Sequence, residues 1–329
     1  MTAESSPPRL SALLADGAWH SGPALAACLG VSRAAVSARI AELRRLGLDI
    51  YSVAGRGYRL RTPLELLDAD RVRAGLSSSQ AGRLAHLDVL ERTDSTNAEL
   101  ARCIDGTTRA CLAEYQSAGR GRAARPWVSP FGANLYLSLA HDMSAPRAPL
   151  GALSLAVGGR VAEALTSLGA QDMGLKWPND LWAGDRKLGG ILIEHRGEAA
   201  GAARLIVGVG INVSMQAPQA AAVDQPWTRL ADHMPAMPGR NHLAASVLGA
   251  VLDAVTGFEA RGFADFRALW SRFDVTRNRG VRLIENDGER FGIARGIGAD
   301  GALQVEIRGV SEAVYAGDVS LRVSGSGAG

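Results

Sequence analysis

The spacing of apolar residues changes twice along this chain of 329 residues. Apolar positions three and four residues apart extend as far as Leu43, strands and helices alternate from Leu84, and a period of two begins at Val281. The length exceeds the usual size of one domain, and a hydrophobic content of 47% is enough for real cores. We therefore predict a multidomain α/β protein, with a helical domain over residues 1–62, an α/β domain over 63–275 and a small β domain over 276–329.

The first domain has the pattern of a helix-turn-helix. Ser21 and Ser32 can each cap a helix, and Gly30 allows a tight turn between the two helices. Two alternating runs, 49–53 and 58–61, then flank residues 54–57, which predicts a hairpin with a basic tip. Helices followed by such a hairpin are typical of a winged helix-turn-helix domain.

A DNA-binding function is the favoured interpretation of this domain, and a three-helix protein-interaction module with solvated arginines is the alternative. The net charge is only +3, so binding to nucleic acid must come from a local basic patch. The residues expected to contact DNA lie on the third helix or at the tip of the hairpin: Ser32, Arg33, Ala35, Ser37, Arg39 and Arg56.

A glycine-rich loop with three arginines follows a short apolar run in the second domain. Residues 110–115 read as a buried strand, and the loop from Gln116 to Trp127 leaves its end. Glycines let a ligand approach the backbone, and guanidinium groups match phosphate or carboxylate oxygens. The loop therefore predicts an anion site. A dinucleotide-binding loop is disfavoured because Pro126 biases Arg125 away from a helix, and an exposed basic loop is the other alternative.

Other segments carry structural signals. Residues 63–79 read as a linker, and residues 216–239 give no indication of function. The remaining apolar runs of the second domain predict strands at 87–90, 135–139, 175–180, 187–194 and 204–213. Residues 94–97 are expected to cap a short helix, and longer helices are predicted at 150–168, 243–258 and 263–273. In the last domain we predict strands at 281–284, 303–307 and 319–323, and a further strand that follows a turn at 286–288 and ends at Ile293. A second turn is predicted at 300–301, and residues 324–329 are predicted to be disordered.

The cysteines and the N-terminus bear on cellular location. Cys28, Cys103 and Cys111 are odd in number and lack metal-ligand spacing, which favours free thiols in a reducing compartment. The first eight residues do not have the pattern of a signal peptide, and no run of about 18 apolar residues occurs. We expect a cytoplasmic protein.

Five motifs in a fixed order resemble one known family. They are Gly30-Val31-Ser32-Arg33-Ala34-Ala35-Val36, Gly119-Arg120-Gly121-Arg122, Lys176-Trp177-Pro178-Asn179-Asp180, Arg186-Lys187-Leu188-Gly189-Gly190 and Gly208-Val209-Gly210-Ile211-Asn212. Over nearly its whole length the chain resembles the bifunctional biotin protein ligase and biotin-operon repressor. No motif position departs from the family, although Ala123-Ala124 makes the loop less basic. The resemblance implies a winged helix, a class II synthetase-like catalytic domain with a mixed sheet, and an SH3-like C-terminal barrel.

The resemblance also implies a reaction. Biotin and ATP form biotinoyl-5′-AMP, and biotin then passes to a lysine of the biotin carboxyl carrier protein of acetyl-CoA carboxylase. Mg²⁺ accompanies the phosphates of ATP, with Asp180 as a candidate ligand through water, and no residue is expected to hold a metal directly. The loop around Arg122 is expected to become ordered when adenylate binds. The adenylate-bound chain is expected to form a homodimer that binds operator DNA and represses biotin synthesis.

Three sets of site residues follow from the family motifs. The groups expected to act in the reaction are Arg120, Arg122, Lys176, Lys187 and Asp180. Biotin is expected to contact Ser95, Thr96, Asn97, Gln116, Gly119, Arg120, Gly121, Arg122, Lys187 and Gly190. The adenylate is expected to contact Arg122, Trp127, Lys176, Asn179, Gly208 and Asn212.

Ordinary structural roles and rival functions remain as alternatives. Trp127 and Trp177 could be core residues, Asn97 a helix cap and Lys187 a solvated hairpin lysine. A lipoate-type ligase and a ligand-sensing repressor without ligase chemistry are the competing functions. A P-loop enzyme is disfavoured because the motif G-x-x-x-x-G-K-[ST] is absent from the sequence.

Overall fold

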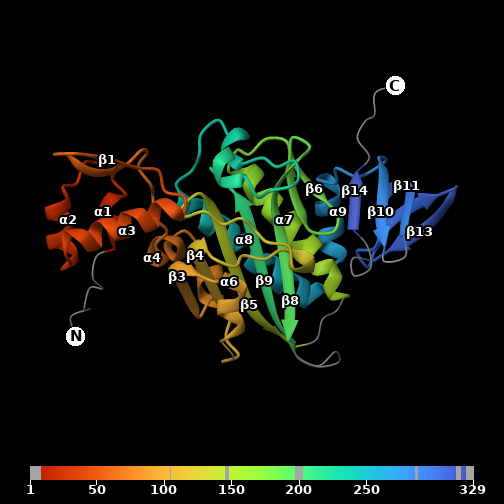
Figure 1. Ribbon diagram of the computed structural model, residues 1–329. Coiled ribbons are helices and arrows are strands. Elements are labelled where there is room, and N and C mark those ends of the chain that lie inside the picture. Colours follow the sequence, from red (N-terminus) through yellow and green to blue (C-terminus); the bar gives the residue numbers. More distant parts are fainter. Residues whose placement is uncertain are drawn as a thin grey trace, which may run out of the picture.

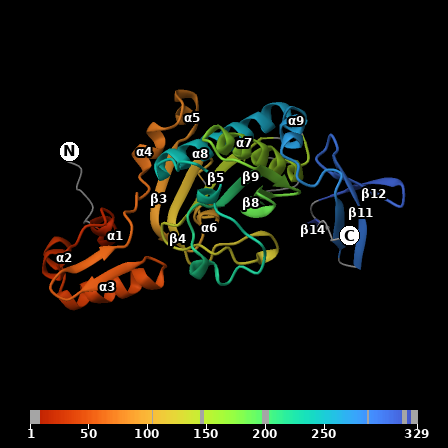
Figure 2. The ribbon, with the colours of Figure 1, turned by 90° about the horizontal axis from the view of Figure 1, so that it is seen from above.

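The computed structural model describes residues 9–103, 105–144, 148–196, 203–285, 288–315 and 320–323. Three parts lie in a row, with a small helical domain at one end, a sheet covered by helices in the middle and a small β domain at the other end (Figure 1). The view from above shows the helical domain projecting clear of most of the central domain (Figure 2).

The first part is a winged helix, as predicted. Its elements are α1 (Leu10–Leu14), α2 (Gly22–Leu29), α3 (Arg33–Arg45), β1 (Ile50–Val53) and β2 (Gly57–Leu60). Both predicted caps are confirmed, because Ser21 Oγ accepts from the Ala24 N–H and Ser32 Oγ accepts from the Ala35 N–H. The strands β1 and β2 form the expected antiparallel hairpin.

The winged helix docks on the central domain through apolar and polar contacts. Phe131 of the central domain is buried in the core of the winged helix, and its N–H donates to the Leu46 carbonyl at 2.9 Å. Arg92 and Glu42 form an ion pair across the same boundary. The segment that joins the two parts is fixed as well, because the Leu67 N–H donates to Glu114 Oε1 at 2.6 Å.

A seven-stranded mixed sheet organises the central part. The spatial order is β3, β4, β5, β9, β8, β7 and β6, and only the β3/β4 pair is parallel. The strands are β3 (His86–Thr93), β4 (Arg109–Gln116), β5 (Asn134–Met143), β6 (Met173–Lys176), β7 (Asp180–Ala183), β8 (Arg186–Arg196) and β9 (Ala203–Asn212). The short β7, which begins at the last residue of the predicted strand 175–180, was not predicted.

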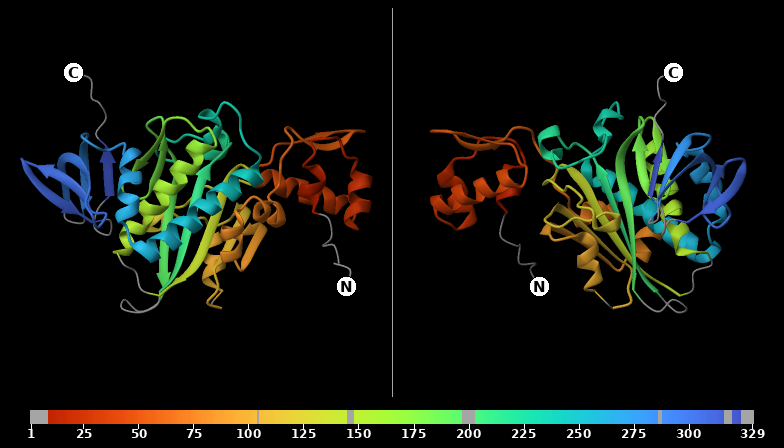
Figure 3. Two further views of the ribbon diagram at one scale, coloured as in Figure 1. Left: turned by 180° about the vertical axis from the view of Figure 1, so that it is seen from behind. Right: turned by 45° about the vertical axis from the view of Figure 1, so that its right-hand side comes forward.

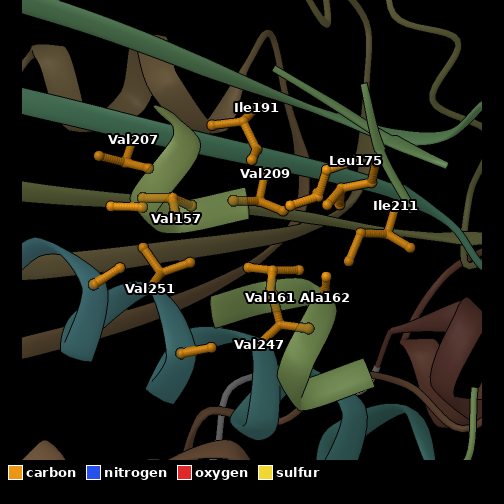
Figure 4. Close-up of a cluster of buried hydrophobic side chains, with 14 of the residues drawn as sticks. Val157, Val161, Ala162, Leu175, Ile191, Val207, Val209, Ile211, Val247 and Val251 are labelled. Carbon is orange, nitrogen blue, oxygen red and sulfur yellow. The ribbon is translucent and has the colours of Figure 1, made fainter. Parts of the chain in front are cut away.

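Helices cover both faces of this sheet. One face carries α7 (Leu153–Ser167) and α8 (Arg240–Arg261), with α9 (Ala264–Arg272) packed on α7 (Figure 3). Side chains of β9 that point to this face meet Val157 and Val161 of α7 and Val247 of α8 (Figure 4). Side chains of β9 alternate between faces, so Ile206 packs instead beside α6 (Thr96–Ala101). The functional cavity lies on this second face.

The predicted linker, 63–79, contains one helix and the start of a second, and neither helix was predicted. Residues 69–74 form α4 (Ala69–Ala74) and residues 78–83 form α5 (Ser78–Arg83). A capping box at Ser77 and Gln80 begins α5, and Gln80 Nε2 donates to Asp253 of α8 at 2.8 Å. Short helices with few apolar residues have little periodicity, so tertiary contacts with α8 decide their formation.

The helix α8 is long and apolar enough to cross a membrane by length and composition alone. In this fold 72% of its apolar window is buried. Together with its contacts to α7 and β5, that burial identifies α8 as a core helix.

The last part is a five-stranded antiparallel sheet. Its order is β13, β12, β11, β10 and β14. The strands are β10 (Gly280–Glu285), β11 (Gly288–Ile297), β12 (Leu303–Ile307), β13 (Val310–Val314) and β14 (Ser320–Val323). The edge strand β13 was not predicted, while the predictions for residues 286–287, 319 and 324–329 lie outside the described residues. Trp177 Nε1 donates to the Gly301 carbonyl at 3.1 Å, which ties this domain to the central one.

Candidate functional site

A cavity of about 480 Å³ opens on the sheet face opposite α7 and α8. That volume suits a small organic ligand. Among its lining residues are fourteen of the predicted site residues: Ser95, Thr96, Asn97, Gln116, Arg120, Gly121, Arg122, Trp127, Lys176, Asn179, Asp180, Lys187, Gly190 and Gly208. The fold thus brings motifs from both halves of the central domain to one place.

A hydrogen-bonded chain of buried polar side chains forms one wall of the cavity. The Thr96 N–H donates to Gln116 Oε1 at 2.9 Å, and Gln116 Nε2 donates to Ser129 Oγ at 3.0 Å. Ser138 Oγ lies 2.7 Å from Thr96 Oγ1 and donates to Asn97 Oδ1 at 2.6 Å. These bonds fix the polar groups in one arrangement before a ligand arrives.

Ser138 and Glu194 complete this chain, and neither was predicted as a site residue. Asn97 Nδ2 donates to Glu194 Oε2 at 2.7 Å, while Glu194 Oε1 lies 3.3 Å from Arg120 Nη2. Ser138 is fully buried on β5, inside a run that reads as an apolar strand. The only signals that could have identified these two residues are a serine within an apolar strand and a glutamate at the end of the apolar run 191–194. Asn97 lies inside α6, so its interpretation as a helix cap is wrong, and Ser95 at the N-cap position makes no side-chain cap bond.

Two lysines and one carboxylate face each other at the opposite side of the cavity. Lys187 Nζ lies 2.8 Å from Asp180 Oδ1, and Lys176 Nζ lies 3.9 Å from Asp180 Oδ2. All three side chains are largely buried, so Lys187 is not a solvated hairpin lysine. The pairing holds two positive charges in place around one negative charge, which leaves the group cationic.

The arginine loop closes over the cavity in an irregular conformation. Arg122 begins the short helix η1 (Arg122–Ala124), and Ala123 and Ala124 both have φ above +50°. Arg122 Nη1 lies 3.4 Å from Asn179 Oδ1, and the side chain is half-buried. Burial lowers the pKa of the Arg122 guanidinium, and the charge of Asp180 opposes that shift. Alanine is rarely found at positive φ, so the loop stores strain.

Trp127 of the same loop lies directly over β9. A Cβ atom at Gly210 would come within 2.7 Å of the indole ring, so only glycine allows this approach. Lys187 Nζ lies 5.8 Å from the centre of the ring. The indole is therefore a wall of the cavity, rather than a residue of the hydrophobic core.

Models of known protein families match three regions of the chain. Residues 89–212 match the Biotin/lipoate A/B protein ligase family, residues 10–59 match an HTH domain, and residues 276–322 match the Biotin protein ligase C terminal domain. The chain is 44% identical to the Bifunctional ligase/repressor BirA of Salmonella typhimurium, over 96% of this chain and 97% of the relative. The chain belongs to the bifunctional biotin ligase/repressor family.

More distant relatives extend the comparison within this ligase family. The Biotin--[acetyl-CoA-carboxylase] ligase of Mycobacterium tuberculosis is 36% identical over 79% of this chain and 97% of the relative. The solved biotin protein ligase of Aquifex aeolicus in complex with biotin and ATP is 27% identical, with a TM-score of 0.63. The match covers 74% of this chain and 99% of that structure. The predicted fold class and enzyme class are confirmed.

Two predicted site residues of this ligase do not line the cavity. Asn212 is buried, and its Nδ2 donates to the Thr228 carbonyl at 3.1 Å. Gly119 lies beneath the loop, where an added Cβ would come within 2.7 Å of Ser129 Oγ. Its small size makes room for the loop itself and not for a ligand.

The segment 216–239, which had no predicted role, packs against the cavity. The Lys187 N–H donates to the Pro226 carbonyl at 3.2 Å, and the Thr228 N–H donates to the Lys187 carbonyl at 2.9 Å. Gln225 lines the cavity. The segment therefore holds the backbone of Lys187 on both sides.

No group of three or more metal-ligating side chains occurs among the residues that the structure describes. Within that part of the chain, Asp180 is the only carboxylate lining the cavity, and both of its oxygens face lysines. The side chains present do not form a protein-held metal site.

The predicted DNA-binding residues of this ligase lie on the surface of the winged helix. Arg33, Ser37, Arg39 and Arg56 are exposed. Ser32 is exposed as well, but its hydroxyl accepts the N–H of half-buried Ala35, so its position is fixed by the helix cap.

Proposed function

We propose that this chain activates biotin with ATP and transfers it to a lysine of a biotin carboxyl carrier protein. The observation that carries this proposal is one cavity with a polar hydrogen-bonding wall on one side and Arg122, Lys176 and Lys187 on the other. A neutral ring with polar edges suits the first wall, and a carboxylate and phosphates suit the second. Membership of the ligase family supports the same substrates.

In the first step a biotin carboxylate oxygen attacks the α-phosphorus of ATP. A new carboxyl–phosphorus bond forms, and the bond to the β-phosphate oxygen breaks, so pyrophosphate leaves. Two unit charges about 4 Å apart repel by about 4 kcal/mol at an effective dielectric of 20. Lys187 and Arg122 offset this repulsion where the two anions meet, and Lys176 stabilises the phosphate charge.

In the second step the uncharged amine of the carrier lysine attacks the acyl carbon. The acyl–phosphate bond breaks and AMP leaves with the electron pair, so little acid–base catalysis is needed. Asp180 is the carboxylate available to accept the proton of the incoming amine.

The individual contacts are part of the same proposal. Biotin contacts Ser95, Thr96, Asn97, Gln116, Arg120, Gly121 and Gly190, while adenylate contacts Trp127, Asn179 and Gly208. Asn212 and Gly119 serve the site indirectly, through Thr228 and through the loop. Mg²⁺ enters only with the phosphates of ATP, and no step is assigned to it.

Calorimetric titration of biotin, with and without a non-hydrolysable ATP analogue, tests the proposal together with a pyrophosphate assay. We expect tight biotin binding and stoichiometric release of pyrophosphate. Binding of lipoate in place of biotin would favour the lipoate-type ligase. Binding of biotin and ATP without pyrophosphate release would favour a sensor without ligase chemistry.

We further propose that the adenylate-bound ligase forms a homodimer that represses transcription from operator DNA in the cytoplasm. Adenylate would order the arginine loop, because neighbouring arginines repel until an anion arrives. A symmetric dimer presents two winged helices to a palindromic site. We also propose that the chain divides into three domains, residues 1–62, 63–275 and 276–329. Equal sedimentation with and without biotin and ATP would contradict the dimer.

A further inference from the structure

The carboxylate of Glu194 joins the polar wall of the cavity to the arginine loop. Asn97 Nδ2 donates to Glu194 Oε2 at 2.7 Å, and Arg120 Nη2 donates to Glu194 Oε1 at 3.3 Å. Asn97 belongs to α6, Glu194 to β8 and Arg120 to the loop that follows β4. Asn97 and Arg120 line the cavity, whereas Glu194 is not among its lining residues. Glu194 therefore contacts two parts of the site without forming its surface.

A glycine of β9 allows Asn97 to reach this carboxylate. Glu194 lies opposite Ile206 of β9, and Gly208 is two residues further along that strand, so all three positions point to the face that carries α6. A Cβ atom at Gly208 would lie only 2.3 Å from Asn97 Oδ1. The missing side chain leaves the space in which the Asn97 amide crosses β9 to the carboxylate on β8.

One oxygen of Glu194 fixes the direction in which the Asn97 amide points, because an ionised carboxylate only accepts hydrogen bonds. The amide nitrogen faces Glu194, and Oδ1 is left to accept from Ser138 Oγ at 2.6 Å. Ser138 Oγ lies 2.7 Å from the hydroxyl of Thr96, which lines the cavity. A single carboxylate thus sets the direction of the hydrogen bonds along the polar wall.

The other oxygen of Glu194 restrains the arginine loop. Among the described residues, no other carboxylate forms an ion pair with Arg120. The two side chains are 46% and 36% exposed, so water screens the pair and its own contribution to stability is small. A backbone bridge joins Arg120 to Pro126, near the other end of the loop. A restraint on Arg120 is therefore passed to both ends of the loop.

We propose that Glu194 is a positioning residue for biotin, which holds the polar wall and the arginine loop in fixed positions relative to each other. Glu194 acts through Asn97 and Arg120, and it does not touch the reacting atoms. The proposal rests on the biotin ligase function above. Once biotin and ATP are both bound, their own contacts keep the loop closed, so loss of Glu194 weakens biotin binding and leaves the rate at saturation unchanged.

Two substitutions of Glu194 separate its two contacts. Glu194→Gln keeps an oxygen that accepts from Asn97, but its N–H groups cannot accept from Arg120, so we expect the Kd for biotin to rise about threefold. Glu194→Ala loses both contacts and leaves the amide without its acceptor, so we expect a rise of about thirtyfold. Calorimetric titration of biotin into the full-length protein measures both changes. Pyrophosphate release at saturating biotin and ATP should keep the wild-type rate.

A double-variant cycle with Arg120→Gln identifies the partner in the loop. Without the charge of Arg120, the change Glu194→Gln removes no further contact, so its effect on the Kd should disappear. Cleavage by trypsin after Arg122, with biotin bound, reports on the loop directly. Glu194→Gln should be cleaved about threefold faster than the wild type, because cleavage follows the fraction of open loop.

Glu99→Gln is the matched control. It removes the same charge from α6, but Glu99 pairs with Arg102, which does not line the cavity. This variant should keep the wild-type Kd and the wild-type rate of cleavage. Thermal unfolding reports whether each variant is folded, and Glu194→Gln with its cycle carries the test if Glu194→Ala does not fold.

The outcomes distinguish this proposal from the ligase function itself. A wild-type Kd in both folded variants of Glu194 would overturn the positioning role and leave the ligase function in place. An undiminished effect of Glu194→Gln in the Arg120→Gln background would overturn it too, as would an equal rise of the Kd in Glu99→Gln. If the wild-type protein neither bound biotin nor released pyrophosphate, the ligase function would fail, and the positioning role with it.

Discussion

The cations of the cavity and those of the winged helix are held in opposite ways. In the cavity, Lys176 is buried, Lys187 is largely buried, and the two share the carboxylate of Asp180. On the winged helix, Arg33, Arg39 and Arg56 are exposed and form no ion pair among the described residues. A buried charge without a partner is costly, whereas an exposed one is solvated by water.

The difference matches the two kinds of anion. A small substrate reaches buried cations whose geometry must be fixed beforehand, and Asp180 keeps them in place until it arrives. A DNA backbone meets a surface and displaces counterions, so free arginines contribute most there. Four predictions test this comparison, from the largest expected effect to the smallest.

Removal of Lys187 should have the largest effect. Lys187→Ala should slow adenylate formation on the order of 10²- to 10³-fold, the range for loss of one electrostatic donor in a catalytic site. Pyrophosphate release with saturating biotin and ATP measures it. Lys187→Arg, which keeps the charge, should be less impaired, and near-normal release by Lys187→Ala would exclude this lysine from the mechanism.

Removal of the Ser138 hydroxyl should weaken biotin binding without changing any charge. Ser138→Ala leaves Asn97 Oδ1 without its buried donor, so we expect the Kd for biotin to rise on the order of tenfold. Calorimetric titration measures the change. Ser246→Ala is the control, because this half-buried serine of α8 donates only to the His242 carbonyl of its own helix among the bonds of the described residues. Unchanged affinity in Ser138→Ala would mean that the polar wall does not position the ligand groups.

Acid should weaken the joint between the two regions. Burial raises the pKa of Glu65, but bonds from the Asn241 side chain and the Arg240 N–H, with the charges of Arg71 and Arg240, bring it below its usual value. A lowered folded-state pKa stabilises the protein above the unfolded-state pKa, and this stability is lost as the pH falls through the folded-state pKa.

Thermal unfolding between pH 7 and pH 3 measures that loss. Glu65→Gln should be less stable than the wild type at pH 7, and the difference should shrink toward pH 3. A difference that stays constant with pH would show that the charge of Glu65 is not involved.

Substitution of one exposed arginine on α3 should have the smallest effect. Arg33→Gln or Arg39→Gln should lower the log–log salt slope of duplex binding by about 0.9, because each removes one phosphate contact. Pyrophosphate release should stay at the wild-type level. A catalytic loss as large as that of Lys187→Ala would contradict the separation of the two cation sets.

Local patterns predicted most elements of this fold, and the misses have physical causes. The serine caps of α2 and α3 and the long apolar stripes of α7 and α8 are strong local signals. The helices α4 and α5 and the strands β7 and β13 are short, with four to six residues each. Segments of that length carry too little periodicity to be recognised without their neighbours.

The residues of the candidate site also fall into those that local motifs predicted and those that they did not. The motifs predicted Arg122, Lys176, Asp180 and Lys187, and the structure brings these residues to one cavity. The partners Ser138 and Glu194 have no motif, and Asn212 carries a motif position yet bonds to Thr228. Sequence spacing gives the face of a strand on which a residue lies, and the neighbour it meets there depends on pairing across the sheet.

The sequence by itself determined the kinds of domain, their order, the anion-binding loop and the family of this protein. Those properties depend on residue types within short stretches, where periodicity, capping and glycine placement act locally. Only the tertiary structure decided that Asp180 holds both lysines, that Glu194 meets Arg120, and that Trp19 and Tyr51 stack with the hairpin arginines. Each of those contacts joins different elements, and strand register and loop closure, which no single segment encodes, fix them.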